Sequence, residues 1–339
     1  MAKVLALVLA LMMVFSCVAC AKEEAPVAEE EAATDAEVTT EEVADKYVVG
    51  ICQLVTHVAL DAATQGFKDA LIDELGEDAV EFKYQDAAGE ANTCSSIVNA
   101  FVSEDVDLIL ANATPALQAA QAATADIPIL GTSVTEYGVA LGIENFDGLV
   151  GGNISGTSDL APLDQQAQML ADWFSVAEYP NVGLLYCSAE ANSQYQVDTV
   201  TAELEAMGYT CTAYPFSDSN DIAAITQQAA DNSDVIYVPT DNKVADNTGI
   251  IDGICQGAGV PIIAGEEGIC SGCGVATLSI SYYDLGYITG KMAAQILTGE
   301  ADISTMEIAY AEDFTYKYNP TICEALSLTA PADYVAIGE

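Results

Sequence analysis

Short apolar runs alternate with segments of helical spacing through most of the chain. In the first half the strand-like runs occupy 47–53, 80–85, 107–111 and 127–131, and the helical segments occupy 59–75, 93–101 and 115–123. In the second half the strand-like runs occupy 182–186, 209–214, 234–238, 260–264 and 275–280, and the helical segments occupy 164–174, 197–207, 222–230 and 284–297. This alternation predicts parallel sheets covered by helices on both faces. The predicted fold class is α/β, with two doubly wound, Rossmann-like lobes.

The first 45 residues follow a different pattern. After Lys3 an apolar run continues to Phe15 and is too short to span a bilayer, which is typical of a secretory signal. The run MMVFSCVACAKEE resembles a bacterial lipoprotein signal, which predicts a signal peptide over residues 1–19 and lipidation of Cys20. Lipidation of Cys17 and ordinary cleavage with free secretion are the alternatives. Residues 20–45 are acidic and lack apolar periodicity, which predicts a disordered tether.

The composition is strongly acidic and constrains the choice of ligand. The chain has 52 Asp and Glu residues against 8 Lys and Arg, for a formal net charge of -44 at pH 7. Nucleic acid is excluded as a partner, because phosphate binding needs clustered cations. Every one of the cations is a lysine, so hydroxyls, amides or helix N-termini would have to hold a ligand carboxylate in place of arginine. With 51% apolar residues, the chain can still bury the cores of about two domains.

Polar clusters follow the predicted strands in both halves of the chain. In open parallel sheets, ligands bind beyond the carboxyl ends of the strands, where helix N-termini also gather. The candidate binding residues are Gln53, His57, Thr114, Thr132 and Ser133 in the first half, and Glu190, Asn192, Ser193, Thr240, Asp241, Asn242 and Glu266 in the second. Each can alternatively cap a helix, which contributes about 1 kcal/mol of stability and implies no ligand. If the halves face each other, the clusters predict one cleft with hydroxyls on one side and carboxylates on the other.

Seven segments between residues 47 and 299 carry a resemblance to a known family. They read VGICQLVTHVALDAATQGFKDAL, LILANATPALQAAQAAT, IPILGTSV, NISGTSDLAPLDQQAQML, VGLLYCSAEANSQYQ, VIYVPTDNKV and ISYYDLGYITGKMAAQIL. They are similar to the substrate-binding lipoproteins of a bacterial ABC importer family, which includes binders of aromatic amino acids. The sequence departs from that family where Val58 replaces a common proline and where Cys187 replaces an asparagine-like residue. These departures weaken any transfer of ligand identity.

The resemblance implies a type I periplasmic-binding-protein fold, in which two lobes joined by crossing segments close on a ligand. Crossings are expected at 155–159, at 279–282 and after Gly299. The first lobe would then comprise 46–157 and about 281–302, and the second would comprise 158–280 and about 303–339. Asp159 and Tyr282 lie at these crossings and join the candidate ligand-binding residues. The protein is expected to be a lipid-anchored monomer outside the cytoplasm that needs no cofactor and delivers a small-molecule ligand to an ABC permease and its ATPase.

The resemblance also implies roles for individual side chains. The hydroxyls expected to hold a ligand carboxylate are those of Thr114, Thr132 and Ser133. The carboxylate expected to receive an ammonium group is mainly that of Asp241, with Glu190 or Glu266 as alternatives. Tyr282 and Tyr283 are candidates for an aromatic wall, with packing near the hinge as the alternative. An amino acid, aromatic or otherwise, or a related amine fits this polarity.

Other readings of the sequence have weaker support. Cys270 and Cys273 have the spacing of half a zinc or redox site, but spacing alone is weak evidence for such a site. A local disulfide or free thiols are favoured, and no metal site is predicted. One histidine and no catalytic motif argue against an enzyme. A sugar- or nucleoside-binding lipoprotein of the same architecture, or a ligand-sensing partner of a membrane receptor, remains the alternative function.

Overall fold

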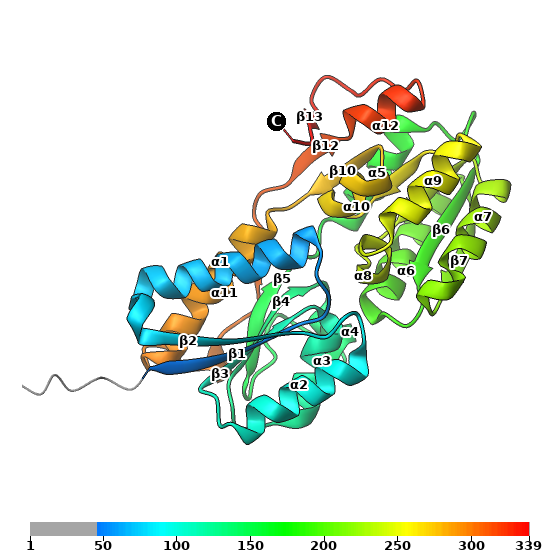
Figure 1. Cartoon of the computed structure of the whole chain (residues 1–339). Helices are drawn as coiled ribbons and strands as arrows, with labels where there is room; N and C mark the ends of the chain where they lie inside the picture. The colour runs from blue at the N-terminus through cyan, green and yellow to red at the C-terminus, as the bar shows by residue number, and fades with distance from the viewer. Residues whose placement is uncertain (1–45, 339) are drawn as a thin grey trace, which may run out of the picture. The chain divides into compact units, whose positions relative to one another are not determined.

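A computed structural model describes residues 46–338 of the chain as part of one compact unit. The predicted signal peptide, the acidic tether and the lipidation site Cys20 lie outside the described residues. None of the helices within 46–338 is both long enough and apolar enough to cross a membrane. The described residues form two lobes, each built on its own sheet (Figure 1).

The first sheet has six strands in the order β11-β5-β4-β3-β1-β2, and every neighbouring pair is parallel. Its strands are β1 (Tyr47–Gln53), β2 (Val80–Asp86), β3 (Leu108–Asn112), β4 (Ile129–Val134), β5 (Ile154–Ser158) and β11 (Ala309–Tyr310). One face packs on α2 (Ala91–Ser103), α3 (Thr114–Ala123) and α4 (Tyr137–Leu141). The other face packs on α1 (Val58–Leu75) and α11 (Tyr282–Leu297). Both faces of the central strands β1 and β3 are thus buried, which accounts for their nearly continuous apolar sequences.

The second sheet repeats this order as β13-β12-β10-β9-β8-β6-β7. Its strands are β6 (Asn181–Cys187), β7 (Thr210–Phe216), β8 (Val235–Val238), β9 (Ile262–Ala264), β10 (Ala276–Ser279), β12 (Thr315–Tyr318) and β13 (Val335–Ala336). Its helices are α5 (Leu163–Trp173), α6 (Ala191–Ala206), α7 (Ile222–Asn232), α8 (Asn242–Ala245), α9 (Thr248–Ala258), α10 (Glu267–Cys273) and α12 (Pro320–Ala325). Strand β12 runs antiparallel to β10, while the remaining pairs are parallel. Three short 3₁₀ helices, η1 (Glu77–Ala79), η2 (Ser219–Asp221) and η3 (Ile303–Thr305), complete the described elements.

The two sheets confirm the predicted α/β fold class. The orders β2-β1-β3-β4-β5 and β7-β6-β8-β9-β10 are equivalent, and each is the doubly wound order of a parallel sheet with a crevice at its reversal point. In the first lobe, α1 and α11 lie side by side (Figure 1). A Cβ atom added at Gly286 would lie 1.9 Å from the carbonyl oxygen of Ala63, so these two backbones approach too closely for any larger residue.

One predicted lobe boundary is corrected by the strand pairing. The sequence assigned residues from about 303 onward to the second lobe, yet β11 pairs with β5 in the first sheet. Ile308, just before β11, is buried in the first lobe's core. The chain therefore passes to the second lobe between β11 and β12, where Phe314 packs beside Tyr282 and Ile280. The sequence missed this because β11 is only two residues long and carries no periodic signal.

The cysteines of the described region are unpaired, with no disulfide among residues 46–338. No group of three or more His, Cys, Asp or Glu side chains in that region is placed to hold a metal ion. Cys270 and Cys273 are both buried on α10 within the second lobe's core. Both side chains of this motif therefore pack in the core.

Candidate functional site

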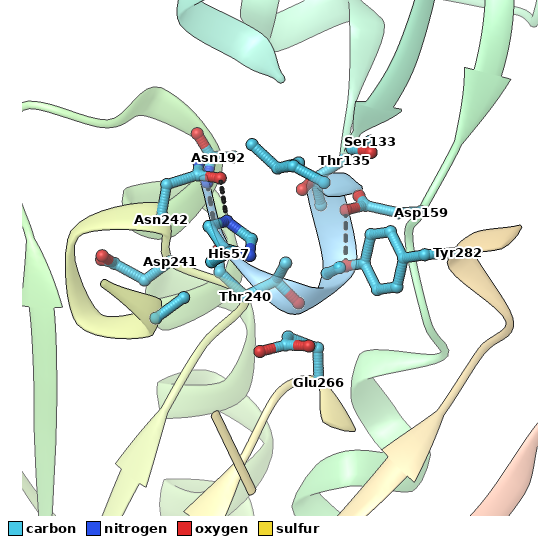
Figure 2. Close-up of a pocket in the computed structure, with 13 residues that line it drawn as sticks. His57, Ser133, Thr135, Asp159, Asn192, Thr240, Asp241, Asn242, Glu266 and Tyr282 are labelled. Atoms are coloured by element: carbon cyan, nitrogen blue, oxygen red, sulfur yellow. Dashed lines mark hydrogen bonds between the residues drawn. The ribbon is translucent and has the colours of Figure 1, made fainter. Parts of the chain in front are cut away.

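A small polar pocket lies between the two lobes, at the carboxyl ends of their strands (Figure 2). The lining residues are His57, Ala59, Leu60, Ser133, Thr135, Asp159, Asn192, Thr240, Asp241, Asn242, Ala245, Glu266 and Tyr282. Its cavity volume is about 10 Å³, which is about the space of one water molecule. In this structure the lobes therefore meet with less space between them than an amino acid occupies, so a ligand of that size requires them to separate further.

Strand ends and the helices that follow them place these side chains in both lobes. His57 lies between β1 and α1, Ser133 lies near the end of β4, and Asp159 follows β5. In the second lobe, Asp241 follows β8 and Glu266 follows β9. This is the crevice position at which doubly wound sheets bind ligands.

The pocket wall contains buried polar atoms that have no hydrogen-bond partner among residues 46–338. They are His57 Nδ1, Ser133 Oγ, Asp159 Oδ1 and Asn192 Oδ1. Buried polar groups are almost always paired, because an unpaired one costs about 1–3 kcal/mol. These atoms come from both lobes and from the crossing after β5. Their concentration in one pocket marks it as the candidate ligand site.

Asp159 is the pocket carboxylate with an unused oxygen. Its Oδ2 accepts a hydrogen bond of 2.9 Å from the Tyr282 hydroxyl, while Oδ1 is buried without a partner (Figure 2). Burial raises the pKa of Asp159, because it penalises the charged form. Burial and the Asp159 charge also hold the pKa of Tyr282 well above its usual range. No lysine of the described chain lines the pocket, so a cationic ligand group beside Asp159 would offset the cost of burying its negative charge.

Asp241 and Glu266 use both of their oxygens on the protein itself. Asp241 accepts hydrogen bonds from the backbone N–H groups of Val244 at 2.9 Å and Cys187 at 2.6 Å. Glu266 accepts from the backbone N–H groups of Gly268 and Ile269. Each therefore caps a short helix, α8 or α10, as well as lining the pocket. Burial raises the pKa of Asp241, and it raises the pKa of Glu266 to about 7.

The sequence predicts that Glu190 contacts the ligand. In the structure, Glu190 is not among the residues that line the pocket. Its carboxylate accepts hydrogen bonds from Asn242 Nδ2 at 2.7 Å, the Asn242 backbone N–H at 3.2 Å and the Lys243 backbone N–H at 3.1 Å. Burial, and then the neighbouring charge of Asp241, raises the pKa of Glu190 to about 7. Glu190 does not line the cavity, because its carboxylate accepts hydrogen bonds from the backbone at the start of α8.

His57 and Asn242 meet across the pocket. His57 Nε2 lies 3.3 Å from Asn242 Oδ1, which joins the first lobe to the second (Figure 2). Burial lowers the pKa of His57, with opposing contributions from Asn242, Asp61 and Asp246. At neutral pH the imidazole is uncharged. A second contact between the lobes is the ion pair of Lys243 Nζ with Glu90 Oε1 at 3.5 Å.

Several residues predicted from the sequence lie outside this pocket wall. They are Gln53, which bonds to Asp61 and Thr64; Thr114, which is buried at the start of α3; Thr132, whose hydroxyl lies 3.2 Å from that of Thr157; and Ser193, which accepts from Asn192. Tyr283 is 40% exposed and donates to Asp69 on the α1–α11 surface. Each of these side chains supports packing or a surface contact.

Thr135 lines the pocket and was missed by the sequence. The pairing of β4 with β5 is irregular between Gly131 and Val134, and Ser133 has a φ of 54°. Such a bulge redirects the following side chains relative to a regular strand. Ser133 and Thr135 line the cavity, whereas the Thr132 hydroxyl lies 3.2 Å from that of Thr157. The polar run GTSVTE was the available signal, but it does not reveal the bulge.

Comparison with known proteins establishes the family. Residues 48–336 match the family described as ABC transporter substrate binding protein. The chain belongs to this family. Its members bind solutes and are not enzymes, and the fold is the type I periplasmic-binding fold that the sequence predicted.

Relatives with named ligands are among the matches. A tyrosine-binding protein of Clostridioides difficile is 35% identical over 258 residues, covering 75% of this chain and 73% of the relative. The structure of an ABC domain in complex with L-Trp from Streptococcus pneumonia is 28% identical, with a TM-score of 0.81, and the match covers 86% of this chain and 99% of that one. The ligand-free, open structure of a substrate-binding protein with adhesive properties from Clostridium difficile is 34% identical, with the same coverage and a TM-score of 0.65.

Proposed function

We propose that this protein binds an aromatic amino acid between its lobes and delivers it to an ABC permease. The observation that carries the proposal is the set of unpartnered buried atoms in the pocket, described above. Asp159 Oδ1 and Asn192 Oδ1 are acceptors, so the pocket favours a ligand rich in N–H or O–H donors. An ammonium group supplies several such donors together with a positive charge.

Charge assigns the two ends of the proposed ligand. The ammonium group would lie at Asp159 Oδ1, since Asp241 and Glu266 already spend their oxygens on helix caps. A carboxylate would lie at the Ser133 hydroxyl, which can donate and has no partner within the described chain. No arginine exists to take that role. This arrangement replaces the sequence-based choice of Asp241 as the main ammonium partner.

The two structural neighbours support binding by closure. The relative in complex with L-Trp has the higher TM-score, 0.81, although its sequence identity is only 28%. The open, ligand-free relative is 34% identical and scores 0.65. The relative with the lower sequence identity thus has the higher TM-score. We infer that the relative arrangement of the two lobes, more than the sequence identity, determines the TM-score. A ligand that contacts both lobes would favour the closed state by its differential affinity.

The remaining parts of the proposal concern location and partners. We propose that the protein is anchored outside the cytoplasm through a lipid on Cys20 and acts as a monomer. The family name and the tyrosine- and tryptophan-binding relatives support the transport role. We also propose that residues 46–157 and the α11 region form the first lobe. The other predicted site residues that line the pocket are proposed to contact the ligand.

Calorimetric titration of the purified domain tests the ligand class. We expect L-tyrosine or L-tryptophan to bind, and we expect tyramine and 3-(4-hydroxyphenyl)propionate to bind much more weakly, because each lacks one charged end. A series of sugars and nucleosides provides the control for the alternative function. Binding of a sugar or nucleoside with no response to any amino acid would overturn the proposed ligand.

A further inference from the structure

A chain of hydrogen bonds runs from Glu190 through Asn242 to His57. Glu190 Oε2 accepts from Asn242 Nδ2 at 2.7 Å. An ionised carboxylate can only accept, so the Asn242 side-chain amide must point its nitrogen toward Glu190. The opposite orientation would place two oxygens against each other. The Oδ1 atom of Asn242 is thereby directed toward the first lobe.

The orientation of Asn242 fixes the proton on His57. Asn242 Oδ1 lies 3.3 Å from His57 Nε2 and has no hydrogen to donate. His57 Nε2 must therefore carry the hydrogen in this contact. Burial lowers the pKa of His57 and keeps the imidazole neutral, although the charges of Asp61 and Asp246 act in the opposite direction. The carboxyl groups of Asp159, Asp241 and Glu266 line the same pocket. A neutral ring protonated at Nε2 has a lone pair at Nδ1.

That lone pair is buried and unsatisfied. His57 Nδ1 has no hydrogen-bond partner within residues 46–338, and His57 lines the cavity. An unpaired acceptor in this position discriminates between ligands. Only a ligand with a suitably placed donor removes the cost of leaving the acceptor without a hydrogen bond. A ligand that places a methyl group or an oxygen there would retain that cost.

We propose that His57 Nδ1 accepts a hydrogen bond from an N–H or O–H group of the ligand, and that Glu190, acting through Asn242, is the positioning residue that sets this tautomer. The inference rests on the proposed function and adds to it a requirement for a donor at one specific atom. Glu190 and Asn242 belong to the second lobe and His57 to the first, so the acceptor is fixed only when the lobes close. Recognition of the donor and closure are thus coupled.

Nitrogen NMR of the histidine ring tests the proposal directly. His57 is the only histidine of the sequence, so untagged protein labelled with ¹⁵N-histidine gives one pair of ring signals. Spectra would be recorded at about pH 8, above the pKa of about 7 for Glu190, with and without L-tyrosine or L-tryptophan. We expect the bound protein to show a protonated Nε2 and an unprotonated Nδ1 whose signal moves in the direction of hydrogen-bond acceptance.

Glu190→Gln is the matched variant, because glutamine has the same shape but can also donate. It permits either orientation of Asn242, so we expect a mixture of tautomers in the complex and an affinity about 3- to 10-fold lower. Glu267→Gln is the control, since Glu267 bonds Lys317 and Ser279 and does not line the pocket. We expect it to leave both the tautomer and the affinity unchanged.

The outcomes separate this inference from the proposed function. Binding of either amino acid to a ring that is charged, protonated at Nδ1 or unchanged at Nδ1 would overturn the inference and leave the function intact. Wild-type tautomer and affinity in Glu190→Gln would remove Glu190 from the positioning role. Absence of binding by both amino acids would overturn the proposed function and the inference together.

Discussion

The two lobes share a strand order but build their halves of the pocket differently. In the second lobe, Asp241 and Glu266 bond to backbone N–H groups, and Asn242 is held by Glu190. In the first lobe, Ser133 has a φ of 54° and a hydroxyl without a partner in the described region. Ala113, at the end of β3, also has a positive φ, of 96°. Residues with side chains rarely adopt such angles, and their presence near a pocket is typical of functional sites.

The contrast indicates a division of labour between the lobes. The second lobe presents a hydrogen-bonded surface that needs no ligand to satisfy it, apart from Asn192 Oδ1. The first lobe and the crossing after β5 contribute strain and unsatisfied atoms, at His57, Ser133 and Asp159. A ligand would satisfy these atoms by contacting the first lobe and the crossing, and would satisfy Asn192 Oδ1 by contacting the second lobe as well. Removing a group from the unsatisfied side should therefore weaken binding without weakening the fold.

Asp159→Asn should give the largest effect on binding. It removes the charge proposed to face the ammonium group but keeps a polar partner for Tyr282. We expect affinity for L-tyrosine to fall about 100-fold or more, as for other buried charge pairs. The free energy of unfolding of the empty protein should stay constant or rise, because a buried carboxylate with a raised pKa has been removed. Calorimetric titration and urea unfolding measure the two quantities.

Asp164→Asn serves as the control, because Asp164 is an exposed carboxylate on α5, shortly after the crossing. It should leave both quantities near their wild-type values. Undiminished affinity in Asp159→Asn would assign the ammonium group to another carboxylate.

The pH dependence of stability examines the second lobe. Glu266 has a pKa raised from 4.5 to about 7 in the fold, so between these values the folded state binds more protons than the unfolded state. Its contribution is fully present below about 4.5 and is lost as pH rises through about 7. At about 1.4 kcal/mol per pKa unit, the loss is at most about 3–4 kcal/mol.

Urea unfolding of the empty protein between pH 5 and pH 8 checks this linkage, at roughly these values. Glu266→Gln should reduce the slope of the unfolding free energy against pH, whereas Glu324→Gln, which changes an exposed residue of α12, should leave it unchanged. An identical slope in wild type and Glu266→Gln would assign the effect to Glu190, whose pKa is also raised to about 7, and to general charge repulsion, which a net charge of -44 makes stronger at high pH.

Ser133→Gly should change binding and stability in opposite directions. Glycine relieves the positive φ and removes a buried hydroxyl, so the empty protein should gain about 1 kcal/mol. Loss of the hydroxyl proposed to hold the ligand carboxylate should lower affinity about 10-fold. Ser133→Ala separates the two causes, because it deletes the hydroxyl and keeps the strain. Equal affinity in all three proteins would place the carboxylate elsewhere.

Sequence periodicity predicted strands β1 to β4 and β6 to β10, but it did not predict β5, whose polar sequence ISGTS was expected only as a crossing. Strand β1 was predicted at 47–53 and observed at Tyr47–Gln53. Helix α9 was missed because Gly249, Gly253 and Gly257 interrupt its pattern. A Cβ atom at each of these glycines would meet nothing within 4 Å, so they occupy the open side of a helix whose other side packs through Ile251 and Cys255. Tertiary packing supplied what local propensity lacked.

The site was only partly predictable for a different reason. The sequence identified the loops after the strands, but it could not rank the carboxylates within them. Asp159, Asp241 and Glu190 are all buried, and only their hydrogen bonds show that Asp159 keeps an unused oxygen. Ser133 and Thr135 line the cavity and Thr132 does not, although all three hydroxyls stand in one polar run. These choices depend on backbone geometry that residue type does not encode.

The ion pair between the lobes should give the smallest effect. Lys243 Nζ lies 3.5 Å from Glu90 Oε1, with side chains 20% and 67% exposed. Exposed pairs contribute about 0.2–1 kcal/mol, so Glu90→Gln should weaken ligand binding about 2- to 3-fold, mainly through faster dissociation. A double-mutant cycle with Lys243→Gln isolates the coupling between the two charges. The coupling should vanish at about 1 M salt, where screening shortens the Debye length to about 3 Å. Because the pair joins the lobes, it should affect ligand affinity and leave the unfolding of an open, empty protein unchanged; an effect on unfolding alone would mean that the lobes stay closed without ligand.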